Sequence, residues 1–287
     1  MNYHKERFHR LWQARATHYV IPFVMFVLLL GTTSIYTGKS DAVASVSSTA
    51  VSTSAQKDGP AYPLAQPAGT ASPDTVITAN YAGYTASGST FSKAHATYVV
   101  PKVTCQADYA TVDMWVGLEA SNNSNIEQAG VAVICSGGPH PSPTYSVFTE
   151  MWPLSPQYST TMAVSPGDTM TSKVSYSSST GFVLKVTNDT TDQYAERTAR
   201  CPSGLSCDRG QVDWMAERAQ VNSSTFYPLA EFQAIPFESD TAATGTTNYG
   251  ISHYHYVAKD MDTLQFKRLV TVSGLSDNGE YFLDQRE

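Results

Sequence analysis

Two short segments of this sequence place polar side chains among apolar ones, at residues 125–131 and 212–218. A strand alternates its side chains between two faces. In the second segment, one face would therefore carry Val212, Trp214 and Ala216, and the other would carry Asp213, Met215 and Glu217. We expect Glu217 to lie opposite an apolar stripe. Taken alone, a glutamate in that position is typical of a solvated surface.

Motifs of several common hydrolases and of nucleotide-binding proteins are missing from the sequence. It has no Asp-Thr-Gly or Asp-Ser-Gly, no Gly-x-Ser-x-Gly, no His-Glu-x-x-His and no phosphate-binding loop. His253 and His255, which we expect on one face of a strand, could hold a metal, but a pair without a third nearby ligand is more often ordinary surface. We expect no metal and no cofactor.

The two polar segments together resemble the signature of the glutamic peptidases, or eqolisins, best known as acid proteases secreted by fungi. In that family a strand of the kind Leu-Gln-Thr-Gly supplies a glutamine and one of the kind Glu-Trp-Ile-Val-Glu supplies a glutamate, which match Gln128 and Glu217. From residue 80 to the C-terminus, further motifs agree in order: Asn80-Tyr81-Ala82-Gly83, Trp115-Val116-Gly117, Phe148-Thr149-Glu150-Met151-Trp152, Pro166-Gly167-Asp168 and Asn188-Asp189-Thr190. The chain is similar to a divergent or bacterial-type member of this family.

The resemblance implies an all-β fold, an antiparallel β-sandwich of two large sheets of the concanavalin-like or jelly-roll type. It also implies an endopeptidase whose catalytic residues are Gln128 and Glu217. In these roles the Glu217 carboxylate would take a proton from an attacking water and return it to the leaving nitrogen, which is worth typically ~10²–10⁴ in rate. The amide NH₂ of Gln128 would donate to the developing oxyanion while its carbonyl aims the water, and one such donor is worth roughly 2.7–4 kcal/mol. A glutamate with an ordinary pKa near ~4.3 is a base only when deprotonated, so we expect an acidic pH optimum. The substrate-binding residues that it indicates are Tyr81, Trp115, Glu119, Glu150 and Trp152. As aromatic residues in a sandwich, Trp115 and Trp152 are equally compatible with plain core.

Four positions depart from the family pattern. The opening Trp is Tyr81, and the acid after Trp-Val-Gly is Glu119 rather than Asp. An acid expected four residues after the glutamine is Ala132, and Arg218-Ala219 stand where Asp-Phe is usual. Substrate preference is therefore not transferred from the fungal enzymes, and Arg218 could move the pH optimum.

The segments that position these residues are predicted to be β-strands. Alternation is clear at Tyr98 and Val100, over residues 182–187, and at Phe266 and Leu269. Turns are expected at Pro166-Gly167-Asp168, Ser179-Thr180-Gly181 and Asp277-Asn278-Gly279. No stretch of ten or more residues after Thr75 has a helical period, which favours a sandwich or barrel of antiparallel strands.

The cysteines and the net charge restrict the environment and the partners. Proximity favours disulfides between Cys105 and Cys135 and between Cys201 and Cys207, although four cysteines allow three pairings. A zinc site is the weaker alternative, because no Cys-x-x-Cys is present. The net charge of −7 becomes about −10 when residues 1–44 are set aside, which argues against nucleic acid as a partner.

The N-terminal quarter has the composition of an export signal followed by a linker. Residues 1–44 combine a basic start, an apolar run and the triplet Ala42-Val43-Ala44, which predicts a signal peptide or, alternatively, a signal anchor. Residues 45–74 are rich in Ser, Thr, Ala and Pro and read as a disordered linker or pro-segment. Residues 75–287 are expected to form the β-sandwich peptidase domain.

The sequence therefore predicts a secreted, acid-acting endopeptidase that cleaves polypeptides, works as a monomer and meets a membrane only if the N-terminal segment stays uncleaved. A lectin-like, carbohydrate-binding sandwich is the main alternative. It would use the same aromatic residues as sugar platforms and would need neither Gln128 nor Glu217. A catalytically inactive surface relative is the third possibility.

Overall fold

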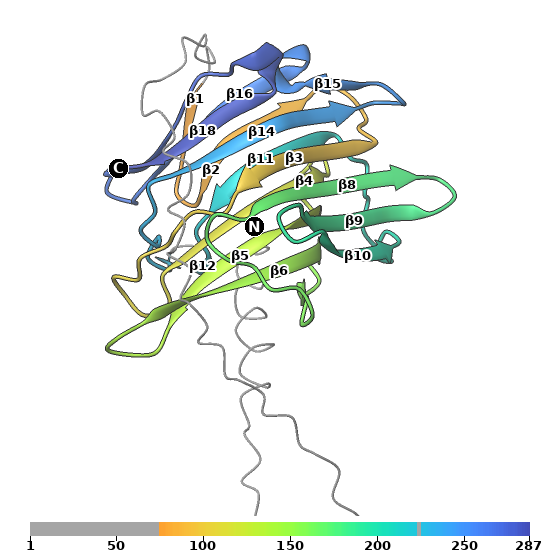
Figure 1. Cartoon of the computed structure of the whole chain (residues 1–287). Helices are drawn as coiled ribbons and strands as arrows, with labels where there is room; N and C mark the ends of the chain where they lie inside the picture. The colour runs from red at the N-terminus through yellow and green to blue at the C-terminus, as the bar shows by residue number, and fades with distance from the viewer. Residues whose placement is uncertain (1–74, 223–224) are drawn as a thin grey trace, which may run out of the picture.

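The computed structural model describes residues 75–222 and 225–287 (Figure 1). The predicted signal segment 1–44 and linker 45–74 lie outside the described residues, and the division of the chain into these parts stays a prediction.

The described residues form strands joined by turns and two short 3₁₀ helices, η1 (Ile251–His253) and η2 (Asp277–Gly279). The strands are β1 (Thr75–Thr78), β2 (Tyr81–Ser87), β3 (Lys93–Val99), β4 (Thr111–Glu119), β5 (Ile126–Ser136), β6 (Ser142–Trp152), β7 (Gln157–Tyr158), β8 (Thr169–Ser177), β9 (Gly181–Asn188), β10 (Gln193–Ala199), β11 (Gln211–Glu217), β12 (Gln220–Asn222), β13 (Thr225–Phe226), β14 (Ala234–Ala243), β15 (Asn248–Gly250), β16 (His255–Asp262), β17 (Arg268–Val272) and β18 (Tyr281–Arg286).

Most of these strands belong to one hydrogen-bonded ladder that folds back on itself. Its order is β10-β9-β8-β3-β14-β18-β17-β16-β2-β11-β4-β5-β6-β7, with β1 beside β16 and β15 beside β14. All of these pairs are antiparallel except β1 with β16. Strands β3, β8 and β9 pack face to face on β4, β5 and β6, so the ladder makes two layers (Figure 1). The predicted antiparallel β-sandwich is confirmed.

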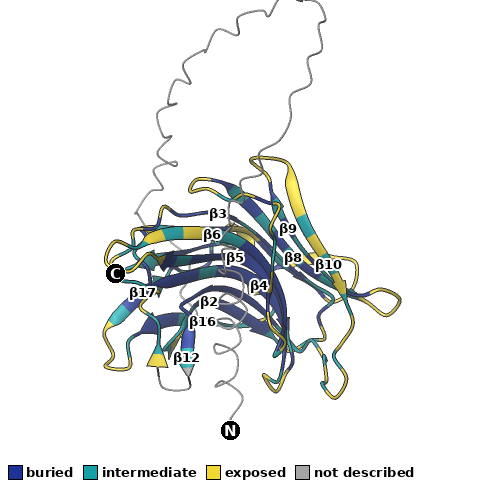
Figure 2. Ribbon diagram, turned by 90° about the horizontal axis from the view of Figure 1, so that it is seen from below, coloured by how far each residue is buried: buried dark blue, intermediate teal, exposed yellow. Residues whose placement is uncertain are grey.

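The main core fills the space between the two layers, and strand alternation supplies it. In β9, Phe182, Leu184 and Val186 are buried while the residues between them are half-buried, as the alternation predicts. In β11, Val212, Trp214 and Ala216 belong to the same core. Burial of this apolar surface is the main favourable contribution to the stability of such a fold. Figure 2 shows β2, β4 and β5 as curved and largely buried, whereas β10 is exposed along much of its length.

The fold tests three predictions made from the sequence, concerning the disulfides, the turns and the alternation near the C-terminus. Both predicted disulfides are present, Cys105–Cys135 and Cys201–Cys207. The predicted turns at residues 166–168 and 277–279 lie between strands, the second of them as η2, and the turn at residues 179–181 ends at the first residue of β9. The expected alternation of Phe266 with Leu269 is wrong, because Phe266 lies in the turn before β17 and is 81% exposed.

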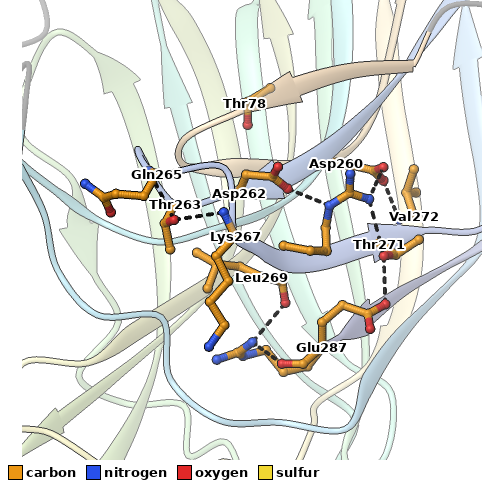
Figure 3. Close-up of polar contacts among 12 residues, drawn as sticks. Thr78, Asp260, Asp262, Thr263, Gln265, Lys267, Leu269, Thr271, Val272 and Glu287 are labelled. Atoms are coloured by element: carbon orange, nitrogen blue, oxygen red, sulfur yellow. Dashed lines mark hydrogen bonds and ion pairs between the residues drawn. The ribbon is translucent and has the colours of Figure 1, made fainter.

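The guanidinium of Arg268 on β17 joins this strand to β16, the strand that pairs with β1. The Arg268 Nε donates a hydrogen bond to Asp262 Oδ1 at 2.5 Å, and its Nη1 pairs with Asp260 Oδ2. Figure 3 shows Asp260 and Asp262 of β16 directed toward this guanidinium. The side chain thereby links β17 to β16, the strand on which β1 pairs.

Candidate active site

The side chains that could do chemistry lie on one face of the layer formed by β2, β11, β4, β5 and β6, pointing away from the main core. We call this the outer face. Strand register arranges it in three rows across the sheet. The glutamine row contains Thr85, Asp213, Gly117, Gln128 and Glu150; the tryptophan row contains Gly83, Met215, Trp115, Gly130 and Phe148; the glutamate row contains Tyr81, Glu217, Asp113, Ala132 and Ser146.

The outer face has its own apolar cluster, separate from the main core. Its buried members are Trp115, Ile126, Ala132, Phe148, Trp152 and Met215, with Tyr81 and Tyr158 packed against them. Trp115 and Trp152 are thus buried as core residues of this cluster and also line the face that carries the polar side chains. The polar side chains of this face therefore sit in largely water-excluded surroundings, where electrostatic interactions are stronger than in water.

Glu217 ends β11 and is only 6% exposed. Its position opposite the apolar stripe of β11 is confirmed, but it is not the solvated residue that the sequence alone would suggest. The indole Nε1 of Trp115 donates a hydrogen bond to Glu217 Oε2 at 3.0 Å. The strand positions the carboxylate, and the indole of the neighbouring strand fixes one of its oxygens.

Gln128 lies near the start of β5 and is fully buried. Its amide Nε2 donates a hydrogen bond to Glu150 Oε2 on β6, at 2.5 Å. An ionised carboxylate only accepts hydrogen bonds, so this contact fixes which end of the amide faces Glu150. The Gln128 Oε1 on the opposite end has no hydrogen-bond partner within residues 75–222 and 225–287. One N–H and the carbonyl oxygen of this amide thus remain to meet a ligand.

The two candidate catalytic rows are separated by the tryptophan row. Gln128 pairs with Gly117 of β4, whereas Glu217 pairs with Asp113, four residues away along the same strand. In a flat sheet this offset corresponds to ~13 Å along the strands and ~10 Å across two strand spacings. The Trp115 indole shows that side chains of this face reach from one row to the next. By register, the tryptophan row lies between the two side chains.

Trp115 is held in place by a close backbone approach. A Cβ on Gly130 would lie 2.0 Å from the Met114 carbonyl oxygen and 2.6 Å from the Trp115 Cβ. These separations are far inside van der Waals contact. Glycine at position 130 therefore allows β5 to approach β4 directly beneath the tryptophan.

A pocket with a volume of about 270 Å³ opens beside Trp115. Four of the five predicted substrate-binding residues line it: Tyr81, Trp115, Glu119 and Trp152. Glu150 does not line it and instead accepts the Gln128 hydrogen bond. The lining also includes Asp213 and Lys259, which sequence reasoning did not single out as site residues. Asp213 could have been found, since it shares the face of Glu217, but Lys259 lies on β16 and is distant in sequence.

Arg218 follows Glu217 but is directed elsewhere. Its backbone N–H donates to the Asn80 carbonyl oxygen, and its Nε donates to the Ala79 carbonyl oxygen at 2.8 Å. The guanidinium also lies over the Phe226 ring, 4.8 Å from its centroid. Burial, together with the charge of Arg286, lowers the pKa of Arg218 to about 10. Arg218 therefore anchors the chain that enters β2.

The expected histidine arrangement is wrong, because His253 lies in η1 and only His255 is on a strand. His253 stacks on Tyr249 with ring centroids 3.9 Å apart. In the part of the chain that the structure describes, no group of three or more His, Cys, Asp or Glu side chains is placed to hold a metal ion.

The fold and the outer face define a β-sandwich of the glutamic peptidase type. The crystal structure of scytalido-glutamic peptidase with a transition state analog inhibitor matches with a TM-score of 0.63 and 20% identity, covering 74% of this chain and 100% of that one. SCP-B of the eqolisin family, in complex with the tripeptide Ala-Ile-His, matches at 0.59 and 21%, with 74% and 100% covered. Aspergilloglutamic peptidase from Aspergillus niger matches at 0.52 and 20%, with 62% and 99% covered. At these identities the likeness shows the fold.

The family is shown by the sequence itself, because the model of the Peptidase A4 family matches residues 79–280. The chain belongs to the Peptidase A4 family, and the resemblance to the glutamic peptidases is confirmed. It is a glutamic endopeptidase, a hydrolase of peptide bonds in polypeptides. No curated protein matches the sequence.

Proposed function

We propose that this peptidase cleaves its substrates with Glu217 as general base and acid and Gln128 as oxyanion donor, in an acidic medium outside the cell. The observation that carries the proposal is that both side chains are buried on one face, where Trp115 donates a hydrogen bond to Glu217 and Gln128 donates one to Glu150.

The reaction follows from the chemistry of these two groups. The Glu217 carboxylate takes a proton from a water whose oxygen bonds to the scissile carbonyl carbon. The negative charge that develops on the carbonyl oxygen is met by the second N–H of the Gln128 amide, and the Gln128 carbonyl oxygen can accept from the attacking water. Protonated Glu217 then returns its proton to the peptide nitrogen as the carbon–nitrogen bond breaks.

The gap between the two side chains suits this sequence of steps. Water and a peptide bond must both lie between the base and the oxyanion donor, so the two side chains should not touch each other in the free enzyme. The Trp115 ring forms the surface under this gap. The pocket lined by Tyr81, Glu119 and Trp152 then holds the residue beside the scissile bond.

Acid action and secretion rest on separate observations. An ordinary glutamate ionises near pH ~4.3, so a glutamate base operates best in acid. The two disulfides fit an oxidising compartment. No helix within residues 75–222 and 225–287 is long and apolar enough to cross a membrane.

The test is digestion of casein by the full chain between pH 2 and pH 8, with pepstatin present, compared with Glu217→Gln and Gln128→Ala variants. Loss of Glu217 should lower kcat by at least ~10³-fold, and loss of Gln128 by ~10²–10³-fold. Matched controls are Glu196→Gln and Gln193→Ala, both on the exposed strand β10.

The unfolding temperature of each variant is measured as well, so that loss of catalysis can be distinguished from loss of folding. A folded Glu217→Gln protein that keeps its activity would remove Glu217 from the mechanism. Activity confined to neutral pH would overturn acid action while leaving the two residues in place.

A further inference from the structure

We infer that the pocket beside Trp115 selects an uncharged side chain with a terminal amide, that of glutamine, next to the scissile bond. This inference rests on the proposed function, because it takes the pocket as a substrate subsite. It is carried by Asp213 and Lys259, two lining residues of opposite charge that compensate each other and still have hydrogen-bonding capacity to offer an occupant.

Asp213 and Lys259 form an ion pair in the lining of the pocket. The Lys259 Nζ lies 3.9 Å from Asp213 Oδ1, so it compensates the charge of the carboxylate without a direct hydrogen bond. Glu119 also lines the pocket, but strand register places it on the far side of Asp213 from Lys259, and it has interactions of its own. A charged occupant would meet a like charge on one member of the ion pair, whereas a neutral occupant would not.

Asp213 offers the occupant an acceptor. Its Oδ1 accepts a hydrogen bond from the Thr85 hydroxyl at 2.5 Å, whereas its Oδ2 has no hydrogen-bond partner among the described residues. Thr85 lies on β2 and Trp115 on β4, and these strands pair with opposite edges of β11. Because Thr85 holds Oδ1 on the β2 side, Oδ2 is left on the side of Trp115, where the pocket opens. A buried carboxylate oxygen without a donor is unfavourable, so an N–H of the occupant would stabilise it.

Lys259 offers the occupant donors. It stands beside Gly83 in the register of β16 with β2, and its side chain is 22% exposed. Its Nζ lies 5.8 Å from the centroid of the Tyr81 ring. Within residues 75–222 and 225–287, no group accepts a direct hydrogen bond from this ammonium, since its contact with Asp213 is 3.9 Å long. An oxygen of the occupant would supply the missing acceptor.

A terminal carboxamide has the groups that match this ion pair. Its NH₂ can donate to Asp213 Oδ2 while its carbonyl oxygen accepts from the Lys259 ammonium. An ionised carboxylate has no donor and an ammonium has no acceptor, so glutamate and lysine each satisfy one member of the pair and are repelled by the other. The methylene stem of glutamine can be buried along the apolar walls, which are formed by Trp115, Trp152, Ile126 and Met215.

The experiment uses the full-length enzyme and internally quenched peptides that differ at one position. Each position from three before to three after the scissile bond carries Gln, Glu, Lys or Met in turn, because these side chains have similar lengths and differ in charge and hydrogen bonding. We expect kcat/KM for Gln to exceed that for Met by about 10-fold or more at one position adjoining the bond. Glu and Lys should both be poorer than Gln. The Gln-to-Glu ratio should fall below pH ~4.3, where the substrate carboxylate gains a proton and with it a donor.

Two variants remove opposite members of the ion pair. Asp213→Asn leaves the charge of Lys259 uncompensated and should lower the Gln-to-Glu ratio of kcat/KM by about 10-fold. Lys259→Met leaves Asp213 uncompensated and should lower the Gln-to-Lys ratio by a similar factor. A structural defect lowers the rates for all peptides together and changes neither ratio. The matched controls Asp192→Asn and Lys102→Met, at exposed positions, should keep the wild-type ratios. Unfolding temperatures identify a variant that fails to fold, and if Asp213→Asn does so, Lys259→Met carries the test.

Either of two results would overturn the inference. One is a wild-type enzyme that cleaves the Met peptides at least as well as the Gln peptides at every position, and the other is a pair of folded variants that keep the wild-type ratios. Both results would leave the proposed mechanism intact, because the peptides are still cleaved. If the folded wild-type enzyme cleaves none of the peptides, the proposed mechanism fails and the inference fails with it.

Discussion

Glu217 and Asp240 are both almost completely buried, yet their surroundings differ. Glu217 accepts a hydrogen bond from the Trp115 indole, and Asp213 on the same face accepts one from Thr85. Asp240 of β14 lies within the fold with both carboxyl oxygens lacking a hydrogen-bond partner among the described residues. Burial and the charges of Asp284, Glu238 and Glu280 raise its pKa well above the ordinary value of 3.8.

The adjacent residues Glu127 and Gln128 also differ in their surroundings. Gln128 faces the outer face, where Glu150 accepts its hydrogen bond, while Glu127 faces the other side of β5. Burial raises the pKa of Glu127 to about 8, although the charge of Arg209 opposes the shift. Asp284 has a raised pKa mainly from burial and from Asp260, and the backbone of Ala216 only partly opposes it.

These two sets of carboxyl groups have different roles. Carboxylates with donors can remain charged while buried and can serve binding or catalysis. Carboxyl groups whose burial outweighs the few donors that reach them, such as the Asn125 amide at Glu127, persist in the fold as neutral acids. These groups set the pH range in which the fold is stable. We call Asp240, Asp284 and Glu127 the unsupported carboxyls.

The largest expected effect is a loss of stability as pH rises. The unsupported carboxyls ionise more readily in the unfolded chain than in the folded one, so the unfolded chain binds fewer protons above pH ~4 and unfolding becomes easier as pH rises. The free energy of unfolding, measured with urea, should fall between pH 4 and pH 8 by more than the ~4 kcal/mol expected from Glu127 alone.

Substitution of Asp240 tests whether this carboxyl group causes the loss of stability at higher pH. Asp240→Asn should flatten the dependence of unfolding free energy on pH, whereas Asp192→Asn, at an exposed position, should not. Stability that stays constant or rises toward pH 8 would contradict the neutral-acid interpretation.

Glu127→Gln is expected to have the next largest effect. The side chain keeps its size and its contact with the Asn125 amide, but it no longer has to remain protonated. With a folded pKa of about 8 against 4.5, the variant should gain about 3 kcal/mol of unfolding free energy at pH 7 and almost nothing at pH 4. Equal stabilisation at both pH values would show that ionisation is not the cause. Glu196→Gln on the exposed strand β10 is the matched control.

Trp115→Phe tests the hydrogen bond from the indole to Glu217, the buried carboxylate that has a donor. Removing the indole N–H deletes a hydrogen bond to a charged group, worth about 1.5–3 kcal/mol. The kcat should therefore fall by about 10- to 100-fold, with the pH dependence of unfolding retained. Trp214→Phe removes a similar donor, which bonds to the His95 carbonyl oxygen inside the main core. That variant should lower stability more than kcat, and the reverse pattern would remove the distinction between the two faces.

Thr85→Val should give the smallest effect. It removes the hydroxyl that donates to Asp213 but leaves Lys259 close to the same oxygen. The free energy of unfolding should fall by about 1 kcal/mol, the usual net contribution of one hydrogen bond. Thr97→Val, which breaks a contact with Thr171 in the other layer, is the matched control and should cost no more than that. A much larger loss for Thr85→Val alone would mean that Asp213 depends on this donor more than a single hydrogen bond accounts for.

Local sequence patterns were sufficient to predict several strands and turns of the fold. Period-two alternation placed Glu217 opposite Val212, Trp214 and Ala216, because neighbouring side chains of a strand must point to opposite faces. Turn residues such as Pro166-Gly167-Asp168 were equally readable, since their backbone preferences are local. The same local rules misplaced Phe266 and His253, where a turn and a 3₁₀ helix interrupt the strands.

The sequence by itself determined the strand character of segments such as residues 182–187, the face that Glu217 takes in its strand and the family that the motifs resemble. Only the tertiary structure decided that Trp115 donates to Glu217, that Glu150 orients Gln128 and that Lys259 lies beside Asp213. These contacts join strands far apart in the chain, and their partners depend on strand order and register. Likewise, whether a buried carboxyl group has a donor depends on which strands pack around it, and alternation within a single strand contains no information about that.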